Sequence, residues 1–84
     1  MPWYRATIKG NGWMFDGGCN VPDEKVVHYE FEEVGDDEAR EKAKAYARGR
    51  EIRREFFLTD PNPNVEITAF IDQGIRQERA YLAN

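Results

Sequence analysis

The sequence predicts an α+β fold, in which an antiparallel sheet of about four to five strands is covered on one face by a single helix. Three features predict it. Several short segments alternate apolar and polar residues, as strands with one buried face do. One Ala-rich segment begins with acidic residues and repeats its apolar positions at helical spacing. A chain of 84 residues has room for one hydrophobic core, so we expect residues 1–84 to form a single domain.

The first part of the chain predicts three strands. Residues 3–9 alternate in character and are rich in aromatic and β-branched residues, which predicts the first strand. Gly10-Asn11-Gly12 follows, and because Asn-Gly is a strong hairpin signal, we expect the chain to turn there and return through residues 13–15. Residues 16–24 have the composition of a loop. Residues 25–33 alternate again and form the third predicted strand.

The middle of the chain predicts the helix, from about residue 37 to residue 48. Negatively charged residues at its start interact favourably with the free N–H groups of the first turn, and short acidic side chains can cap these groups. The stripe that we expect to face the sheet consists of Ala39, Ala43, Tyr46 and Ala47. Gly49 stands where many helices end in a left-handed residue.

The last part of the chain predicts a second hairpin. Residues 51–59 could prolong the helix, but Phe56-Phe57-Leu58-Thr59 favours a strand. A proline-rich turn follows, and residues 65–71 alternate as a strand that pairs with 51–59. Residues 75–82 fit either a final edge strand or a short helix. The predicted order is therefore β-β-β-α-β-β and a tail.

The composition favours a cytoplasmic protein. Cys19 is the only cysteine, so no intramolecular disulfide can form, and the N-terminal residues lack the features of a signal peptide. The longest apolar runs are far shorter than the roughly 18 residues that a membrane span needs. We therefore expect no contact with a membrane.

Few residues offer catalytic or metal-binding chemistry. The chain has one histidine, His28, and its one cysteine lies in a predicted loop with no third group to orient the pair. The acids 36–38 lack the surrounding oxygen ligands of a calcium loop. We therefore predict no metal, no cofactor and no enzymatic activity.

Charge is segregated along the chain. Residues 1–39 have a net charge of −6, residues 40–58 of +4 and residues 59–84 of −2. The acidic residues predicted to bind a partner lie on the third strand and at the helix start: Glu30, Glu32, Glu33, Asp36, Asp37 and Glu38. The basic candidates lie on one helix flank and beyond it: Arg40, Lys44, Arg48, Arg50, Arg53 and Arg54. The alternative for both sets is an ordinary solvated surface whose charges pair weakly.

Two tryptophans add candidate anchors. Trp3 and Trp13 stand on either side of the predicted first turn. Tryptophan is enriched at the energetic centres of protein interfaces, but it equally serves to cover a core. Both roles stay open for each residue.

The segment Val26-Val27-His28-Tyr29-Glu30-Phe31-Glu32, followed by Asp36-Asp37-Glu38-Ala39-Arg40-Glu41-Lys42-Ala43, resembles small phage-encoded proteins, among them anti-CRISPR proteins. The resemblance is one of composition and covers residues 25–48. It implies a compact acidic domain that blocks a CRISPR effector complex by occupying a nucleic-acid or subunit surface in the host cytoplasm. It transfers no individual site residue.

Three functions are therefore compared. The first is a non-enzymatic protein-binding module, most concretely a phage-type inhibitor that covers a basic surface of a nucleic-acid-binding complex. The second is a nucleic-acid accessory protein that uses the basic helix flank on phosphates, although a pI near 5.0 disfavours direct nucleic-acid binding. The third is a homo-oligomeric structural protein, for example a homodimer, whose exposed edge strands pair between copies.

Overall fold

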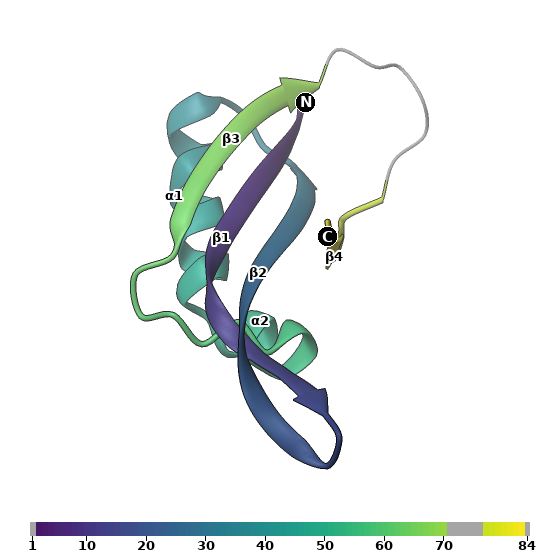
Figure 1. The fold of residues 1–84 in the computed structure, drawn as a ribbon. Helices are drawn as coiled ribbons and strands as arrows, with labels where there is room; N and C mark the ends of the chain where they lie inside the picture. The colour runs from purple at the N-terminus through teal and green to yellow at the C-terminus, as the bar shows by residue number, and fades with distance from the viewer. Residues whose placement is uncertain (1, 71–76, 84) are drawn as a thin grey trace.

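A computed structural model describes residues 2–70 and 77–83. Its strands are β1 (Trp3–Asp16), β2 (Cys19–Glu32), β3 (Asn64–Phe70) and β4 (Arg79–Leu82), and its helices are α1 (Asp36–Arg48) and α2 (Arg50–Phe56). The strands form one antiparallel sheet in the order β3-β1-β2-β4 (Figure 1). The predicted α+β class and antiparallel sheet are confirmed, and a second helix joins the predicted one.

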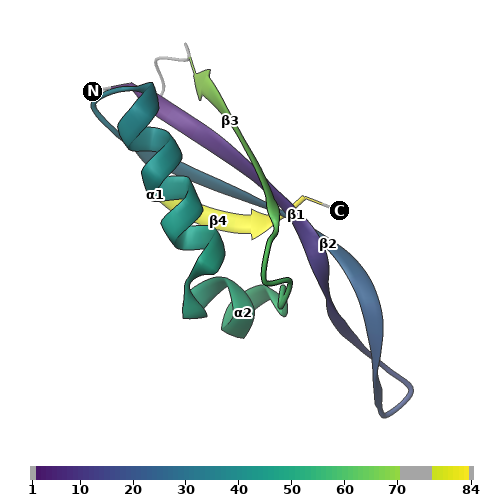
Figure 2. The same ribbon diagram turned by 90° about the vertical axis from the view of Figure 1, so that its left-hand side faces the viewer.

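Helix α1 lies against one face of the sheet, and α2 turns away from its end (Figure 2). The side chains between α1 and the central strands are apolar and buried: Tyr4, Ala6 and Ile8 of β1, Val27, Tyr29 and Phe31 of β2, and Ala39, Ala43 and Ala47 of α1. Alanine has the smallest apolar side chain, so its stripe lets the helix axis approach the sheet closely. The ring of Tyr46 closes one side by stacking on Tyr29, with 4.0 Å between the ring centroids.

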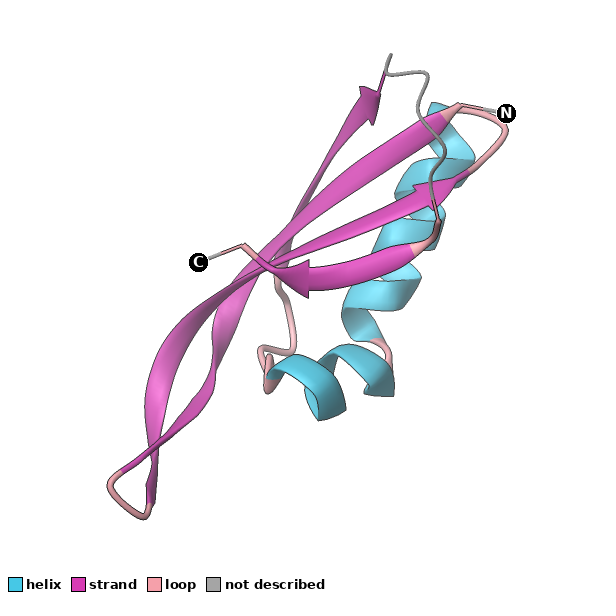
Figure 3. Cartoon of the chain, turned by 90° about the vertical axis from the view of Figure 1, so that its right-hand side faces the viewer, coloured by secondary structure: helices cyan, strands magenta, loops and turns pink. Residues whose placement is uncertain are grey.

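The chain does not turn at Gly10-Asn11-Gly12, as predicted, but continues straight through these residues in β1. The turn lies at Gly17 and Gly18, whose φ angles of 58° and 87° are left-handed and favour glycine. The predicted return strand 13–15 is therefore the end of β1, and most of the predicted loop 16–24 is the beginning of β2. The result is one long hairpin whose end projects beyond the rest of the sheet (Figure 3).

The predicted helix is confirmed in extent, but both of its ends differ from the prediction. The N-cap is Gly35, which has no side chain, and no side-chain hydrogen bond caps this end. The acids Asp36, Asp37 and Glu38 instead occupy the first turn, where their charge faces the positive end of the helix dipole. Gly49 is extended, with φ −78°, and separates α1 from α2 instead of ending a helix in the left-handed conformation.

The strand predicted for residues 51–59 is wrong, because residues 50–56 form α2. If α1 continued past Arg48, Ile52 would lie far round the helix from the alanine stripe. The break at Gly49 instead redirects the chain into α2, and Ile52 is fully buried. Phe57 ends α2 in the left-handed conformation, and Leu58 forms an isolated bridge with Gly12. Local β-propensity was therefore outweighed by the burial of Ile52 in a redirected helix.

Strand β3 matches the prediction for residues 65–71 over its described part, but its partner differs. It pairs with β1, so that Trp3 faces Phe70 and Lys9 faces Asn64, and not with residues 51–59. Of the two forms left open for the tail, residues 79–82 adopt the edge strand and pair with β2. Residues 71, 75 and 76 lie outside the described residues. In the described part of the chain, neither helix has the length and apolar composition to cross a bilayer.

Candidate protein-docking arm

The projecting end of the hairpin, residues 13–22, is called the arm because it extends beyond the bridge between Gly12 and Leu58. Three consecutive large apolar residues lie on it, and all are exposed: Trp13 by 43%, Met14 by 41% and Phe15 by 74%. The molecule measures 44 Å along its longest axis and 24 and 16 Å along the others, which reflects this projection. Large apolar side chains on a soluble domain are usually buried, so such a group marks a candidate interface.

Both faces of the arm carry apolar side chains. Trp13 lies opposite Pro22 on one face, and Met14 lies opposite Val21 on the other. Successive residues of a strand point to opposite faces, so one covering layer cannot bury both sets. Neither helix reaches the arm (Figures 1 and 3). Among the described residues, these side chains stay exposed.

The base of the arm is fixed by the linker between α2 and β3. The Trp13 N–H donates to the Phe57 carbonyl oxygen at 3.0 Å, and the N–H groups of Thr59 and Asp60 donate to the Asn11 carbonyl oxygen at 3.0 and 2.9 Å. The Asp60 carboxylate in turn accepts the Asn11 N–H at 3.0 Å. This bond, with a second one from the Asn62 N–H, lowers the pKa of Asp60. We call this set of bonds the clamp.

Gly12 makes the clamp possible. A Cβ atom at this position would lie 2.1 Å from the Phe57 carbonyl oxygen and 2.9 Å from Cγ of Lys25. A side chain at this position would therefore fit only if the linker and the Lys25 side chain both moved. The glycines that predicted a turn therefore permit the close crossing of two backbone segments.

Phe57 is an exposed aromatic residue in a costly backbone conformation. It has φ 58° and ψ 27°, and 57% of its side chain is exposed. The left-handed conformation costs a residue with a Cβ atom about 1–2 kcal/mol. Its carbonyl oxygen accepts the Trp13 N–H, so this residue lies beside the base of the arm.

Pro22 limits the way in which the arm can bind. The N–H of its partner Trp13 points away from β2, toward Phe57, so this pair is not joined by ladder hydrogen bonds. Proline at such a position costs the hairpin no hydrogen bond and removes a donor from the outer edge of β2. A partner strand added at the outer edge of β2 would therefore receive no backbone hydrogen bond from Pro22. The arm is therefore suited to contacts through side chains.

The arm and its base carry excess negative charge. The Lys25 ammonium pairs with the Asp23 carboxylate at 2.9 Å and is largely buried. Asp16 lies exposed beside the turn, and Glu24 lies at the base. Acidic groups thus accompany the exposed apolar side chains.

Glu30 differs from the exposed acidic residue that the alternation predicted. It is 2% exposed, and its carboxylate accepts hydrogen bonds from Arg5 at 3.0 Å, Arg79 at 2.8 Å and Tyr81 at 2.8 Å. Burial raises its pKa, but these bonds from Arg79, Tyr81 and Arg5 together outweigh burial and lower the pKa to about 2. Glu30 fixes β4 to the sheet and does not present its charge to solvent.

The other predicted acidic residues do not form a single face with it. Glu33, Asp37 and Glu38 lie together at the start of α1, around a shallow hollow that Glu41 and Lys42 also line. The Tyr4 hydroxyl donates a hydrogen bond to the Asp36 carboxylate at 2.9 Å. Glu32 is half-buried on the sheet face that α1 does not cover.

The predicted basic residues are divided as well. Arg40, Lys44 and Arg48 form a row along the flank of α1 beside β3. Arg50 lies on the opposite flank, near Tyr46, while Arg53 and Arg54 are exposed on α2. Of the two tryptophans, Trp3 is half-buried in the sheet between Glu32 and Phe70, and only Trp13 lies on the arm.

Cys19 and His28 are placed far apart. They are nine positions apart on one strand, a span of about 30 Å at the rise of a β-strand. His28 is within 3.2 Å of the Thr7 hydroxyl oxygen, and burial, with a smaller effect of Arg5, lowers its pKa. Within residues 2–70 and 77–83, no three His, Cys, Asp or Glu side chains are grouped as metal ligands.

Reasoning from the sequence did not identify Met14, Phe15 and Phe57 as candidate site residues. The available signal was the Gly17-Gly18 pair, which is a hairpin turn in its own right and is flanked by apolar residues on one side. The Asn11-Gly12 pair is a second turn signal in the same region, and the two signals predict different turn positions. Comparison of the chain with family models, curated proteins and solved structures finds no match.

Proposed function

We propose that this chain is a non-enzymatic protein-binding module that inserts its arm into a cleft of a partner protein. One observation carries the proposal: Trp13, Met14 and Phe15 are exposed on both faces of a hairpin that is held away from the core. Aromatic residues and methionine are enriched in interfaces, where their burial dominates the binding energy.

The clamp supports the proposal because it prepares the arm for binding. A two-stranded hairpin alone is only marginally stable in water. Here the backbone bonds of Asn11 and Trp13 to the linker fix its base. A preformed arm loses less conformational entropy when it binds, which favours affinity.

The charge of the arm indicates the kind of cleft that fits it. Asp16 is exposed beside the turn, and the arm base carries Asp23 and Glu24 against one paired lysine. A cleft with an apolar floor and a basic rim is complementary to this pattern. Nucleic-acid-binding complexes present such rims, so the inhibitor function implied by the resemblance to anti-CRISPR proteins is the specific form of this proposal.

The test is capture of the partner by arm variants. The immobilised parent chain is incubated with host lysate, and the retained proteins are identified by mass spectrometry. Phe15→Ser and Trp13→Ser remove exposed apolar groups, and we expect each to retain roughly tenfold less partner, as truncation of an interface anchor does. Because Phe15 is 74% exposed, its loss leaves the fold intact.

Val34→Ser is the matched control. Val34 is an exposed apolar residue too, 62% exposed, but it lies in the loop before α1. We expect this variant to capture the partner like the parent. Equal capture by the folded arm variants and by the parent would refute docking through the arm.

A further inference from the structure

The flank of α1 beside β3 carries a row of cations that is poor in partners. Arg40, Lys44 and Arg48 follow at four-residue spacing, and so lie on one side of the helix. Within the described residues, no carboxylate pairs with Lys44 or Arg48, and Arg40 reaches only the 96% exposed Asp37, at 3.6 Å. Lys42, on the other flank, is by contrast bound to Glu78 at 3.0 Å. The row is therefore available to an external anion.

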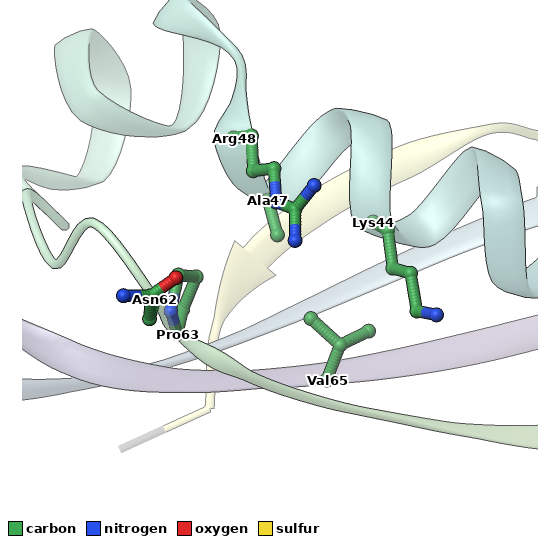
Figure 4. Close-up of a pocket in the computed structure, with 6 residues that line it drawn as sticks. All are labelled: Lys44, Ala47, Arg48, Asn62, Pro63 and Val65. Atoms are coloured by element: carbon green, nitrogen blue, oxygen red, sulfur yellow. The ribbon is translucent and has the colours of Figure 1, made fainter.

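The row borders a groove of about 140 Å³ between α1 and the start of β3. Its apolar part consists of Ala47, Pro63 and Val65, and its polar part of Lys44, Arg48 and the Asn62 amide. Figure 4 shows the side chains of Lys44 and Arg48 extending from α1 toward β3, above Val65. A ligand in this groove would meet two positive charges over an apolar floor.

The adjoining edge of the sheet offers unused backbone groups. The bonds of Asn11 and Trp13 to the linker show that odd-numbered residues of β1 direct their N–H and C=O groups away from β2. Their even-numbered partners in β3 exchange hydrogen bonds with them, because alternate residues of an antiparallel pair do so. Val65, Ile67 and Ala69 then direct their backbone groups outward, where β3 is the last strand of the sheet among the described residues.

The two features lie side by side. In Figure 1, α1 extends past the outer side of β3, and Lys44 and Arg48 line the groove between α1 and the start of β3. A strand added at this edge would therefore run beside these cations. Every second side chain of that strand would point toward α1. Carboxylates at these positions would meet Arg40, Lys44 and Arg48.

We infer that β3 and the basic row form a second binding site, for an extended acidic segment of a partner protein that adds to the sheet as a fifth strand. Backbone hydrogen bonds to β3 supply the register, and alternate carboxylates on the row supply the selectivity. A segment of opposite charge would be repelled. The site is independent of the arm, which lies at the other end of the hairpin from the β3 pairing region.

The experiment uses a fluorescein-labelled, end-blocked peptide of about eight residues in which Glu alternates with Thr, a length that matches the edge strand. Its binding to the full chain is followed by fluorescence anisotropy and by NMR of the backbone amides. We expect binding that weakens between about 50 and 300 mM salt, as screening requires. The amide signals of Val65, Ile67 and Ala69 should shift. A peptide with Lys in place of Glu should not bind, and equal binding of the two peptides would overturn the inference.

Two variants separate the parts of the site. Lys44→Glu combined with Arg48→Glu should weaken peptide binding roughly tenfold or more, because charge reversal makes the row repulsive. Arg53→Glu combined with Arg54→Glu makes the same change of charge on α2, and should leave binding nearly unchanged. Ala69→Pro removes one outward donor from an exposed position and no hydrogen bond to β1. It should also weaken binding, and unchanged binding would rule out strand addition.

Nucleic acid is the competing ligand for a basic row. A labelled single-stranded and a duplex oligonucleotide are therefore titrated under the same conditions. Oligonucleotide binding that depends on Lys44 and Arg48, without binding of the acidic peptide, would overturn the inference in favour of phosphate recognition. The arm variant Phe15→Ser should bind the peptide like the parent, so failure of either site can be told apart from failure of the other.

Discussion

Glu30 is the residue at which burial and charge conflict most. Its carboxylate is almost completely removed from solvent, yet it keeps its charge because two arginines and a tyrosine donate hydrogen bonds to it. The guanidinium groups of Arg5 and Arg79 stack on Phe70 and Tyr81. This network joins β1, β2 and β4 on the sheet face opposite α1.

The network makes stability dependent on acid. The folded pKa of Glu30, about 2, lies below its ordinary value of 4.5. A lowered pKa stabilises the fold above the ordinary value, and this contribution is lost as the pH falls from about 4.5 toward 2. We expect Glu30→Gln to lower the free energy of unfolding at pH 7 by about 3 kcal/mol or more, since it breaks a buried ion pair.

Urea unfolding at pH 7 and at pH 2.5 measures this effect. The difference between parent and variant should be large at pH 7 and much smaller at pH 2.5. Glu66→Gln changes an exposed carboxylate on the same sheet face and serves as the control. A pH-independent difference would show that Glu30 stabilises the fold through its shape and not its charge.

Phe57 stores strain at the base of the arm. We expect Phe57→Gly to keep or raise stability, by up to about 1 kcal/mol, because glycine adopts the left-handed conformation without steric cost. The adjacent Phe56 packs against the core, so Phe56→Gly should cost about 3 kcal/mol or more. Thermal unfolding compares the two. A large loss of stability in Phe57→Gly would mean that the exposed ring contributes packing that outweighs the strain.

At the scale of elements, the clamp decides where the arm begins. Gly12→Ala would place a methyl group against the Phe57 carbonyl oxygen, so the linker must move and the Trp13 hydrogen bond must lengthen. We expect a loss of about 2–4 kcal/mol in the free energy of unfolding, typical of strain imposed on a tightly packed site.

The measurement is urea unfolding combined with hydrogen exchange of the Trp13 amide, which should speed up in the variant. Gly35→Ala is the control, because Gly35 has extended backbone and its added Cβ would meet only the flexible end of Glu38. We expect it to have a small effect. Unchanged exchange at Trp13 in Gly12→Ala would show that the clamp does not hold the arm.

The two hairpin signals in the first part of the chain show what the sequence could and could not predict. Gly10-Asn11-Gly12 and Gly17-Gly18 both permit a turn, and local chemistry favours the Asn-Gly pair, which is not the site that turns. The choice depends on the linker after α2, which crosses β1 at Gly12. That contact joins residues far apart in the chain, so it lies outside any local pattern.

The helix and the strands with a regular apolar period could be predicted from the sequence, but the elements against which they pack or pair could not. The alanine stripe of α1 and the alternation in β3 follow from burial of one face. Whether residues 51–59 form a strand or a helix depends on whether Ile52 can reach the core from a second helix. Similarly, alternation placed Glu30 on the face away from α1, but the burial of Glu30 depended on Arg79 and Tyr81 from the distant tail.

At the scale of the whole molecule, the charged residues are distributed differently from the one acidic and one basic surface that the sequence predicted. The acidic residues are dispersed over the open sheet face, the start of α1 and the arm. Three of the six basic residues remain together, on the flank of α1 beside β3. The arm and this row are separate surfaces, so a partner could engage either one without covering the other.

The turn of the arm also holds the only cysteine of the chain. Cys19 is exposed and directly follows Gly18, at the point of the hairpin farthest from the clamp. A maleimide dye attached there would report on the arm without entering the core. Oxidation to a disulfide would join two chains through their arms and leave both folds intact. The Cys19 thiol is therefore a suitable site for labelling, immobilisation or cross-linking.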